Sequence, residues 1–244
     1  MKNNNLKHRW NTKSFIKRTK KLNREDLEKL YPSESWALFR IILKAKNVID
    51  LGCGNGAMSS IVNKINKKCI YTGLDHQSFL IKQAKIKYKH SKFLDKDLEF
   101  FISENKKKYD LVMMWSVIKS IQNWRDLILK SLAFAERYLI FDIRVVRGNV
   151  EKFDEKFLHA KYGNRKGAQL VLGYQNLKNF LSKQKKQIKK IEIAGYKSDW
   201  GKNVVYKLRK KETYLITVVI YKNINNSKKK KINLYEQVPA ELSK

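Results

Sequence analysis

The stretch VIDLGCGNGAMS, residues 48–59, decides the fold of this 244-residue chain. It begins with apolar and β-branched residues typical of a short buried strand, and Asp50 lies near the end of that strand. Glycines follow at the alternate positions 52, 54 and 56, and a helical pattern starts at Ala57. Because glycines allow a sharp turn and leave backbone N–H groups uncovered, this unit predicts a cradle for a nucleotide cofactor.

Two cofactors fit this turn. Gly52, Gly54 and Ala57 satisfy the dinucleotide spacing G-x-G-x-x-G/A, and Asp75 follows about twenty residues later, where a ribose-binding acid is expected. A nicotinamide dinucleotide therefore remains an alternative. Asp50 argues against it, because a carboxylate at the mouth of the strand repels a pyrophosphate but attracts the ammonium and sulfonium groups of S-adenosylmethionine.

At these residues the sequence resembles the class I, Rossmann-like, S-adenosylmethionine-dependent methyltransferases. The first motif of that family is an acid, one further residue and three glycines at alternate positions, matched here by Asp50, Gly52, Gly54 and Gly56. The resemblance extends over about residues 35–221. It implies an α/β fold, a doubly wound and mostly parallel seven-stranded sheet with an antiparallel last strand. It also implies transfer of a methyl group from the sulfonium to an O, N or C nucleophile.

The apolar pattern along the chain agrees with this fold. Strands alternate with helices from the first strand onward, which predicts a parallel sheet with both faces covered. The resemblance implies that the last strand is the one inserted antiparallel. The predicted strands after the first are residues 69–74, 92–94, 109–115, 138–143, 187–195 and 212–221.

The resemblance implies further cofactor contacts at the ends of these strands. Asp75, just past the second strand, would accept hydrogen bonds from both ribose hydroxyls. Asp97 falls where the third motif of the family meets the adenine amino group, and Asp95 is the alternative. The expected cofactor-binding residues are Asp50, Gly52, Cys53, Gly54, Gly56, Asp75, Asp97 and Trp115, and no metal is expected.

The sequence says less about the methyl acceptor and the residues that bind it. Residues 116–121, SVIKSI, resemble the fourth motif of small-molecule methyltransferases, but Lys119 and Ser120 replace its usual histidines and leave a general base there without support. No Asn/Asp-Pro-Pro-aromatic sequence follows the fourth strand, and neither cysteine lies where base C5-methylating enzymes place a nucleophile. The polar segment from 145 to about 179 should hold the acceptor determinants. The catalytic residues remain unknown, with His159, Tyr162 and Arg165 as candidates from that segment.

Composition limits the cellular setting and the partners. The net charge is +32, but lysine is spread through nearly every predicted helix together with many asparagines, which favours compositional drift over a selected surface for RNA or membranes. Two cysteines without metal or disulfide spacing suit a reducing compartment, and no apolar run reaches the length of a membrane span. A cytoplasmic protein is therefore expected.

These observations predict three regions and one preferred function. Residues 1–34 form a basic N-terminal arm and short helix, which could contact a membrane surface, residues 35–224 the methyltransferase domain, and residues 225–244 a basic linker and tail. The preferred acceptor is a small molecule or a lipid- or glycan-linked group. The alternatives are an RNA methyltransferase that uses the basic surface, a non-catalytic cofactor-binding module, and an NAD-dependent oxidoreductase.

Overall fold

The computed structural model describes residues 24–162, 165–199, 204–206, 212–224 and 231–243. Most of the predicted N-terminal arm, residues 1–23, lies outside the described residues, as do positions 225–230 of the predicted linker. Within the described residues no helix is both long enough and apolar enough to cross a membrane.

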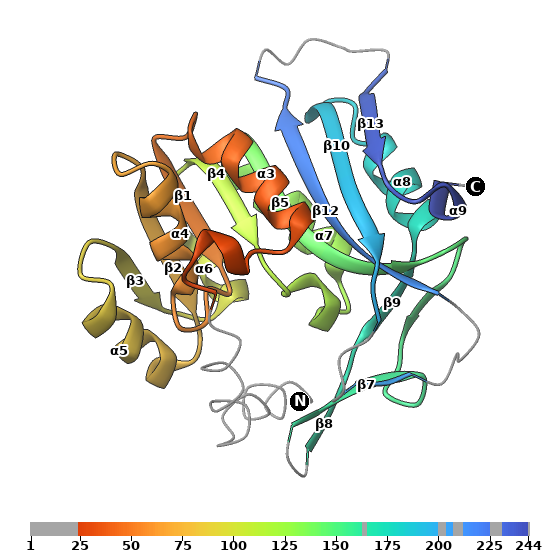
Figure 1. Ribbon diagram of the computed structural model, residues 1–244, viewed down its shortest axis with the longest axis horizontal. Helices are drawn as coiled ribbons and strands as arrows, with labels where there is room; N and C mark the ends of the chain where they lie inside the picture. Colours follow the sequence, from red (N-terminus) through yellow and green to blue (C-terminus); the bar gives the residue numbers. More distant parts are fainter. Residues whose placement is uncertain (1–23, 163–164, 200–203, 207–211, 225–230, 244) are drawn as a thin grey trace.

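One large sheet forms the centre of the molecule (Figure 1), with the strand order β13-β10-β12-β5-β4-β1-β2-β3. The strands from β1 to β5 are mutually parallel, whereas β12 runs antiparallel to both of its neighbours, β5 and β10. The predicted fold class, with its reversed strand, is therefore confirmed. The bounds are β1 Asn47–Leu51, β2 Ile70–Asp75, β3 Lys92–Asp95, β4 Tyr109–Met114, β5 Ala135–Val146, β10 Ile188–Lys197, β12 Thr213–Lys222 and β13 Asn233–Gln237.

Helices cover both faces of this sheet because successive strand residues point to opposite sides. Val48 of β1 joins a hydrophobic cluster with α3, α4 and α5, whereas its neighbour Ile49 joins a second cluster with α6, α7 and α8. The strand β4 is buried along its whole length, as its continuous apolar sequence predicts. The helices are α3 Pro32–Ile42, α4 Ala57–Ile65, α5 Ser78–Lys87, α6 Leu98–Glu104, α7 Trp124–Phe134 and α8 Tyr174–Ser182.

In the part of the chain that the structure describes, the sheet contains ten strands rather than the seven expected. Residues 233–237, expected in a tail beyond the domain, form β13 and pair in parallel with β10. Ile232 and the residue Leu242, which belongs to the short helix α9 (Ala240–Ser243), are buried in the same core as α8. The tail therefore docks on the domain because it supplies apolar side chains and a row of backbone partners to the edge strand.

The segment after β5 forms strands rather than the polar surface helix that its composition allows. Strands β6 (Glu151–Phe153) and β9 (Leu170–Gly173) extend the main sheet from β5. A separate small sheet contains β7 (Leu158–Tyr162), β8 (Arg165–Ala168) and β11 (Val204–Tyr206), and Figure 1 shows β7 and β8 projecting beyond the main sheet.

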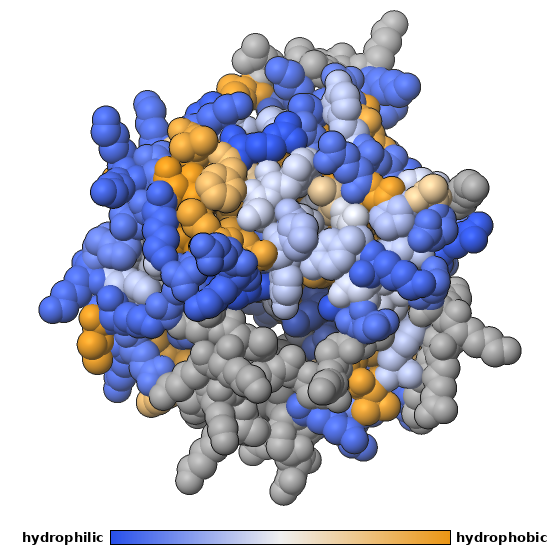
Figure 2. Space-filling model, in the orientation of Figure 1, coloured by the Kyte–Doolittle hydropathy of each residue, from blue (hydrophilic) through white to orange (hydrophobic). Residues whose placement is uncertain are grey.

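The surface is mostly hydrophilic on the face drawn in Figure 2, with apolar side chains gathered in the region of α3. Phe39 and Leu43, at the end of that helix, are among the exposed large apolar residues. Leu38, Ile41 and Ile42 of the same helix are buried against the sheet, and Trp36 is partly buried. The helix is therefore amphipathic, and its outer face is not purely polar.

Candidate functional site

The turn between β1 and α4 depends on its three glycines. Gly52, Gly54 and Gly56 all have positive φ, at +81°, +57° and +77°. A residue with a side chain pays about 1–2 kcal/mol in this region, so the alternate glycines are a requirement of the backbone path. The expectation of a sharp glycine turn is met at each position.

The three glycines differ in what surrounds them. A Cβ at position 52 would lie 2.6 Å from Val117 Cγ2, and one at position 56 would lie 2.5 Å from Phe93 Cε1. A Cβ at Gly54 would meet nothing within 4 Å. Gly52 and Gly56 therefore let neighbouring side chains pack, whereas Gly54 presents bare backbone to open space where a ligand can lie.

Asp75 ties this turn to the neighbouring strand. It is the last residue of β2, and its Oδ2 accepts a hydrogen bond from the Gly54 N–H at 2.9 Å. Its Oδ1 accepts from the Gln77 N–H, also at 2.9 Å. Since each carboxylate oxygen has two lone pairs, Asp75 retains the capacity to accept further bonds from a ligand.

Asp50 is a buried acid that receives a hydrogen bond from the described residues on only one of its two carboxylate oxygens. Its side chain is almost fully buried, and the Tyr71 hydroxyl donates to its Oδ2 at 2.7 Å. Its Oδ1 is buried and has no hydrogen-bond partner in the described part of the chain. Burial raises the pKa of Asp50 to about 7, against the lowering effect of the Tyr71 hydroxyl. Asp50 thus holds an acceptor that a polar or cationic ligand group would satisfy.

Trp115 supplies a second buried polar atom. It directly follows β4, the strand next to β1 in the sheet, and the register pairs Asp50 with Met113. Trp115 packs in the cluster with α3, α4 and α5, and its Nε1 has no partner among the described residues. Two neighbouring strands therefore end in an unsatisfied buried acceptor and an unsatisfied buried donor. Such atoms are rare in folded proteins and fit a site completed by a bound polar group.

The remaining predicted cofactor residues have local structural roles. The Cys53 thiol lies against Gly73, where a Cβ would come within 2.8 Å of the sulfur, and burial raises its pKa well above the usual range. Asp97 is the N-cap of α6, and its side chain accepts from the N–H groups of Glu99 and Phe100. Asp95, the alternative, ends β3 and is exposed. Their contact with a cofactor remains a prediction.

The structure adds one residue that the sequence did not single out, Asp142, and it makes Asp142 the partner of Ser116, the first residue of the segment that resembles the fourth motif. Among the described non-glycine residues only Ser116 has a positive φ, +59°, and its side chain is exposed two residues beyond β4. Its N–H donates to Asp142 Oδ1, and its hydroxyl donates to Oδ2 at 3.4 Å. Asp142 lies on β5 and is buried. A strained conformation held in this way costs on the order of 1–3 kcal/mol and marks a candidate functional position.

Two other charged side chains, Glu34 and Arg144, lie near Asp142. Glu34, at the start of α3, is fully buried, pairs with Arg24 at 2.8 Å and accepts a hydrogen bond from the Tyr31 N–H. Burial raises the pKa of Glu34 to about 7, opposed by Arg24 and supported by the nearby charge of Asp142. Arg144, two residues after Asp142, donates from Nη1 to the carbonyl oxygens of Ser198 and Asp199. A sequence signal for this cluster existed, because Asp142 interrupts an apolar strand.

The predicted catalytic candidates lie apart from the glycine turn in the topology. His159 belongs to the small sheet on β7, where it is buried and its Nδ1 lies 2.8 Å from the Glu155 carbonyl oxygen. The side chains of Tyr162 and Arg165 lie outside what the structure describes. A catalytic role for any of these three residues remains a prediction.

Comparison with known proteins reveals a family match over most of the chain. Residues 42–212 match the family described as "Methyltransferase domain". A shorter segment of 83 residues is 36% identical to methyltransferase 235L of Invertebrate iridescent virus 6, whose own activity is assigned provisionally. That segment spans 34% of this chain and 30% of the viral protein.

Solved structures share the fold at low sequence identity. The N-terminal domain of EvdMO1, with SAH (S-adenosylhomocysteine) bound, superimposes with a TM-score of 0.58 over 84% of each chain at 11% identity. The plantazolicin methyltransferase BpumL, in complex with a monoazolic desmethylPZN analogue and SAH, gives a TM-score of 0.57 at 14% identity. That alignment covers 89% of this chain and 94% of BpumL. At sequence identities this low, the structural similarity shows a common fold and nothing more.

Proposed function

This chain belongs to the methyltransferase-domain family and takes its methyl group from S-adenosylmethionine, and we propose that it delivers this group to a small-molecule acceptor. The family match, residues 42–212, includes the glycine turn, β4 and Asp142. The observation that carries the proposal is the exposed Ser116 beside the turn. It has a positive φ, and its N–H donates to the buried Asp142.

The residues around the turn suit this cofactor rather than a dinucleotide. Gly54 leaves space for the ligand, Asp75 offers acceptors to ribose hydroxyls, and the Asp50 carboxylate favours the cationic methionine end. When bound, S-adenosylmethionine supplies an electrophilic methyl group on a sulfonium that leaves as a neutral thioether. The unsatisfied Nε1 of Trp115 provides a donor on the same side of the sheet.

The contribution of the chain to the reaction is mainly alignment. An in-line displacement needs the nucleophile held opposite the sulfonium, and good alignment alone supplies several kcal/mol of the barrier reduction. Ser116 is exposed two residues beyond β4, and its neighbour Val117 packs against Gly52 of the turn, so Ser116 can contact the acceptor. Asp142 positions Ser116 through the backbone N–H and the hydroxyl. A general base is not required when solvent accepts the proton that the nucleophile loses on methylation.

Three observations support a small acceptor. The sequence after β4 lacks the Pro-Pro-aromatic element of enzymes that methylate exocyclic base amines and instead forms a short 3-10 turn, Ile118–Ser120. The names of the similar structures refer to small acceptors, such as the desmethylPZN analogue bound to BpumL. The insertion after β5 borders the segment that follows β4, because the Gln169 side-chain amide donates to the Ser120 hydroxyl at 3.2 Å.

The test is transfer of a radioactive methyl group to separated acceptor pools. The parent protein is incubated with labelled S-adenosylmethionine and, in parallel, with a small-molecule extract, total lipid, total RNA and total protein. Label should enter the small-molecule pool with the parent and not with Gly54→Val. Label confined to the RNA or protein pool would contradict the small-acceptor proposal.

RNA remains the second candidate because the net charge is +32. Binding that serves catalysis should persist at physiological salt and should depend on RNA structure, whereas adventitious binding by scattered lysines should fall steeply with salt. A filter-binding titration across salt concentrations separates the two. Cofactor binding without transfer to any pool would instead support a non-catalytic module.

A further inference from the structure

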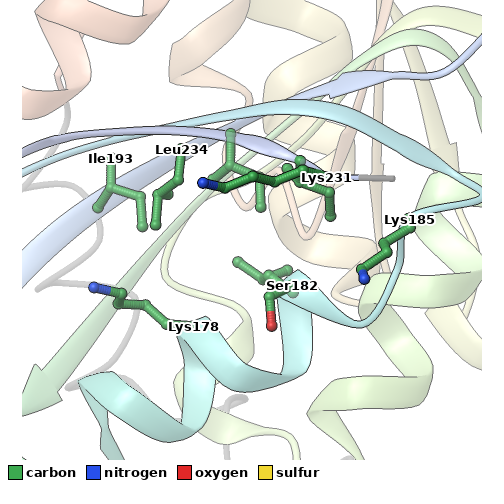
Figure 3. A pocket seen from close by; sticks show the side chains of 9 residues that line it. Lys178, Ser182, Lys185, Ile193, Lys231 and Leu234 are labelled. Carbon is green, nitrogen blue, oxygen red and sulfur yellow. The ribbon is translucent and has the colours of Figure 1, made fainter. Parts of the chain in front are cut away.

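A cavity lies between α8 and the edge strands β10 and β13, apart from the site described above (Figure 3). Its volume is about 220 Å³. In the order of the sheet, β10 is separated from β1 by β12, β5 and β4, so the cavity shares no strand with the glycine turn. The lining residues are Lys178, Leu181, Ser182, Lys185, Ile191, Ile193, Lys231, Ile232 and Leu234.

The lining has two parts with different chemistry. The interior is aliphatic, formed by Leu181 of α8, by Ile191 and Ile193 of β10, and by Ile232 from the docked C-terminal segment, while the exposed Leu234 of β13 borders the opening. Three lysines also line the cavity, and Figure 3 shows Lys178 on α8, Lys185 on the chain that follows this helix, and Lys231 on the segment before β13. An apolar slot with a cationic rim is thus assembled only when β13 is in place.

The positive charge at this rim is only partly compensated. The Lys178 ammonium contacts both oxygens of Glu236 at 3.0 Å. Lys185 and Lys231 form no ion pair with an acid of the described residues. The segment that follows α8, residues 183–190, contains no acid and five lysines: Lys183, Lys185, Lys186, Lys189 and Lys190. Of these, Lys190 pairs with Glu192. The local potential therefore favours an anion.

We propose that this slot binds a single-chain anionic amphiphile, with its alkyl chain against the aliphatic interior and its carboxylate at the rim that carries Lys185 and Lys231. A cavity lined by aliphatic side chains gains little from water and gains from apolar occupancy. The volume of about 220 Å³ is below the range of roughly 300–1,000 Å³ typical of sites that enclose a whole drug-sized ligand. It therefore suits one chain whose head remains at the rim.

Other occupants fit less well. The N-terminal segment of this chain is itself strongly basic, so like-charge repulsion disfavours it at a lysine rim. Nucleic acid would use the lysines but not the interior, because the lining contains no aromatic ring on which a base could stack. The combination of a narrow aliphatic interior and an ammonium rim is what selects an amphiphilic anion.

Calorimetric titration of the full chain tests this proposal with two probes that share a ten-carbon chain. We expect saturable one-site binding of decanoate, and binding of decyltrimethylammonium at least about tenfold weaker, because the head group then meets like charge. Equal affinity for both probes, or no saturable binding of decanoate, would overturn the proposal. Thermal unfolding of each variant below confirms that it is folded.

Two double substitutions distinguish binding at the lysine rim from diffuse attraction by the many lysines of the surface. The double substitution Lys185→Glu with Lys231→Glu should weaken decanoate binding by about tenfold or more. The matched control, Lys183→Glu with Lys186→Glu, changes the same charge on two exposed lysines outside the cavity lining and should stay within about threefold of the parent. An equal loss in the control would overturn a specific site and indicate diffuse attraction.

Ser182→Trp, which fills the slot without a charge change, should abolish binding, and retained affinity would contradict occupancy of the interior.

Discussion

The proposed cofactor end and the proposed acceptor end of this molecule are built by different means. At the cofactor end, the path of the backbone forms the site, through three glycines with positive φ and an acid that accepts from the Gly54 N–H. At the proposed acceptor end, side chains from distant segments come together, since Ser116 and Asp142 are 26 residues apart and Glu34 comes from α3. The first end follows from local sequence, whereas the second exists only in the assembled sheet.

This difference has a consequence for mutation. A backbone-built site fails when a side chain is added, because the ligand and the new atoms compete for the same space. A site built by side chains fails when one is removed, because a buried partner is left unsatisfied. The two ends should therefore respond to different substitutions and should be separable by experiment.

The largest expected effect is at Gly54. Gly54→Val places a branched side chain in the open space beside the turn, so we expect S-adenosylhomocysteine binding to be lost, by about a hundredfold or more in affinity. Gly148→Val is the matched control, because Gly148 also has positive φ, +86°, and also faces open space but lies outside the turn. It should carry the same backbone strain of about 1–2 kcal/mol and bind the ligand normally. Equal loss in both variants, measured by calorimetry, would show that strain rather than blocking is responsible.

Asp75 tests whether a side chain also matters at the cofactor end. Asp75→Ala should weaken S-adenosylhomocysteine binding by about ten- to a hundredfold, since hydrogen bonds to a charged group contribute about 1.5–3 kcal/mol. Part of this loss comes from the freed Gly54 N–H, so the variant also tests how firmly the turn is held. Calorimetry on a folded variant with unchanged affinity would remove Asp75 from the site.

Asp142 tests the acceptor end. Asp142→Ala leaves the Ser116 N–H without its acceptor and should lower the free energy of unfolding by about 1–3 kcal/mol, whereas Asp142→Asn keeps an oxygen in place and should lose less. Both variants should bind S-adenosylhomocysteine within about twofold of the parent. Denaturant unfolding and calorimetry measure the two quantities. A loss of cofactor affinity comparable to that of Gly54→Val would show that the two ends are not separable.

The smallest effect is a pH dependence from Asp50. Burial raises the pKa of Asp50 from 3.8 to about 7, so the folded protein holds a proton that the unfolded chain has released between these values. The stability from this proton is complete below pH 3.8 and is lost as the pH rises through 7, and Glu34 contributes with the same sign. Binding of a cationic ligand requires the ionised acid and should strengthen by several-fold from about pH 5.5 to 7, below the titration of an α-amino group.

Asp50→Asn is the variant that checks this assignment. Its affinity for S-adenosylmethionine should be lower at neutral pH and nearly independent of pH over the same interval, and its melting temperature should vary less with pH than that of the parent. Calorimetry and thermal unfolding at matched ionic strength supply both curves. An unchanged pH profile of binding in the variant would assign the titration to another group.

The sequence predicted what local rules determine. The strand at 48–51, the glycine turn, the helix from Ala57 and the buried strand at 109–114 were all predicted, because apolar periodicity and positive-φ glycines are local signals. The docked strand at 233–237 was not predicted, because its five side chains are all exposed and give no apolar pattern. Of the described tail residues, only the nearby Ile232 and Leu242 enter the core. The Ser116–Asp142 contact depends on the register of β4 against β5, which no local pattern encodes.

The central claim is that the glycine turn is a site for S-adenosylmethionine and its product, and not for a dinucleotide. Titration of the parent protein with S-adenosylhomocysteine and, separately, with NAD tests it most directly, with melting temperature as a second readout. We predict one saturable site for S-adenosylhomocysteine, a rise of roughly 5–10 °C at about a hundred times its dissociation constant, and neither effect with NAD. Saturable binding of NAD without binding of S-adenosylhomocysteine would contradict the account.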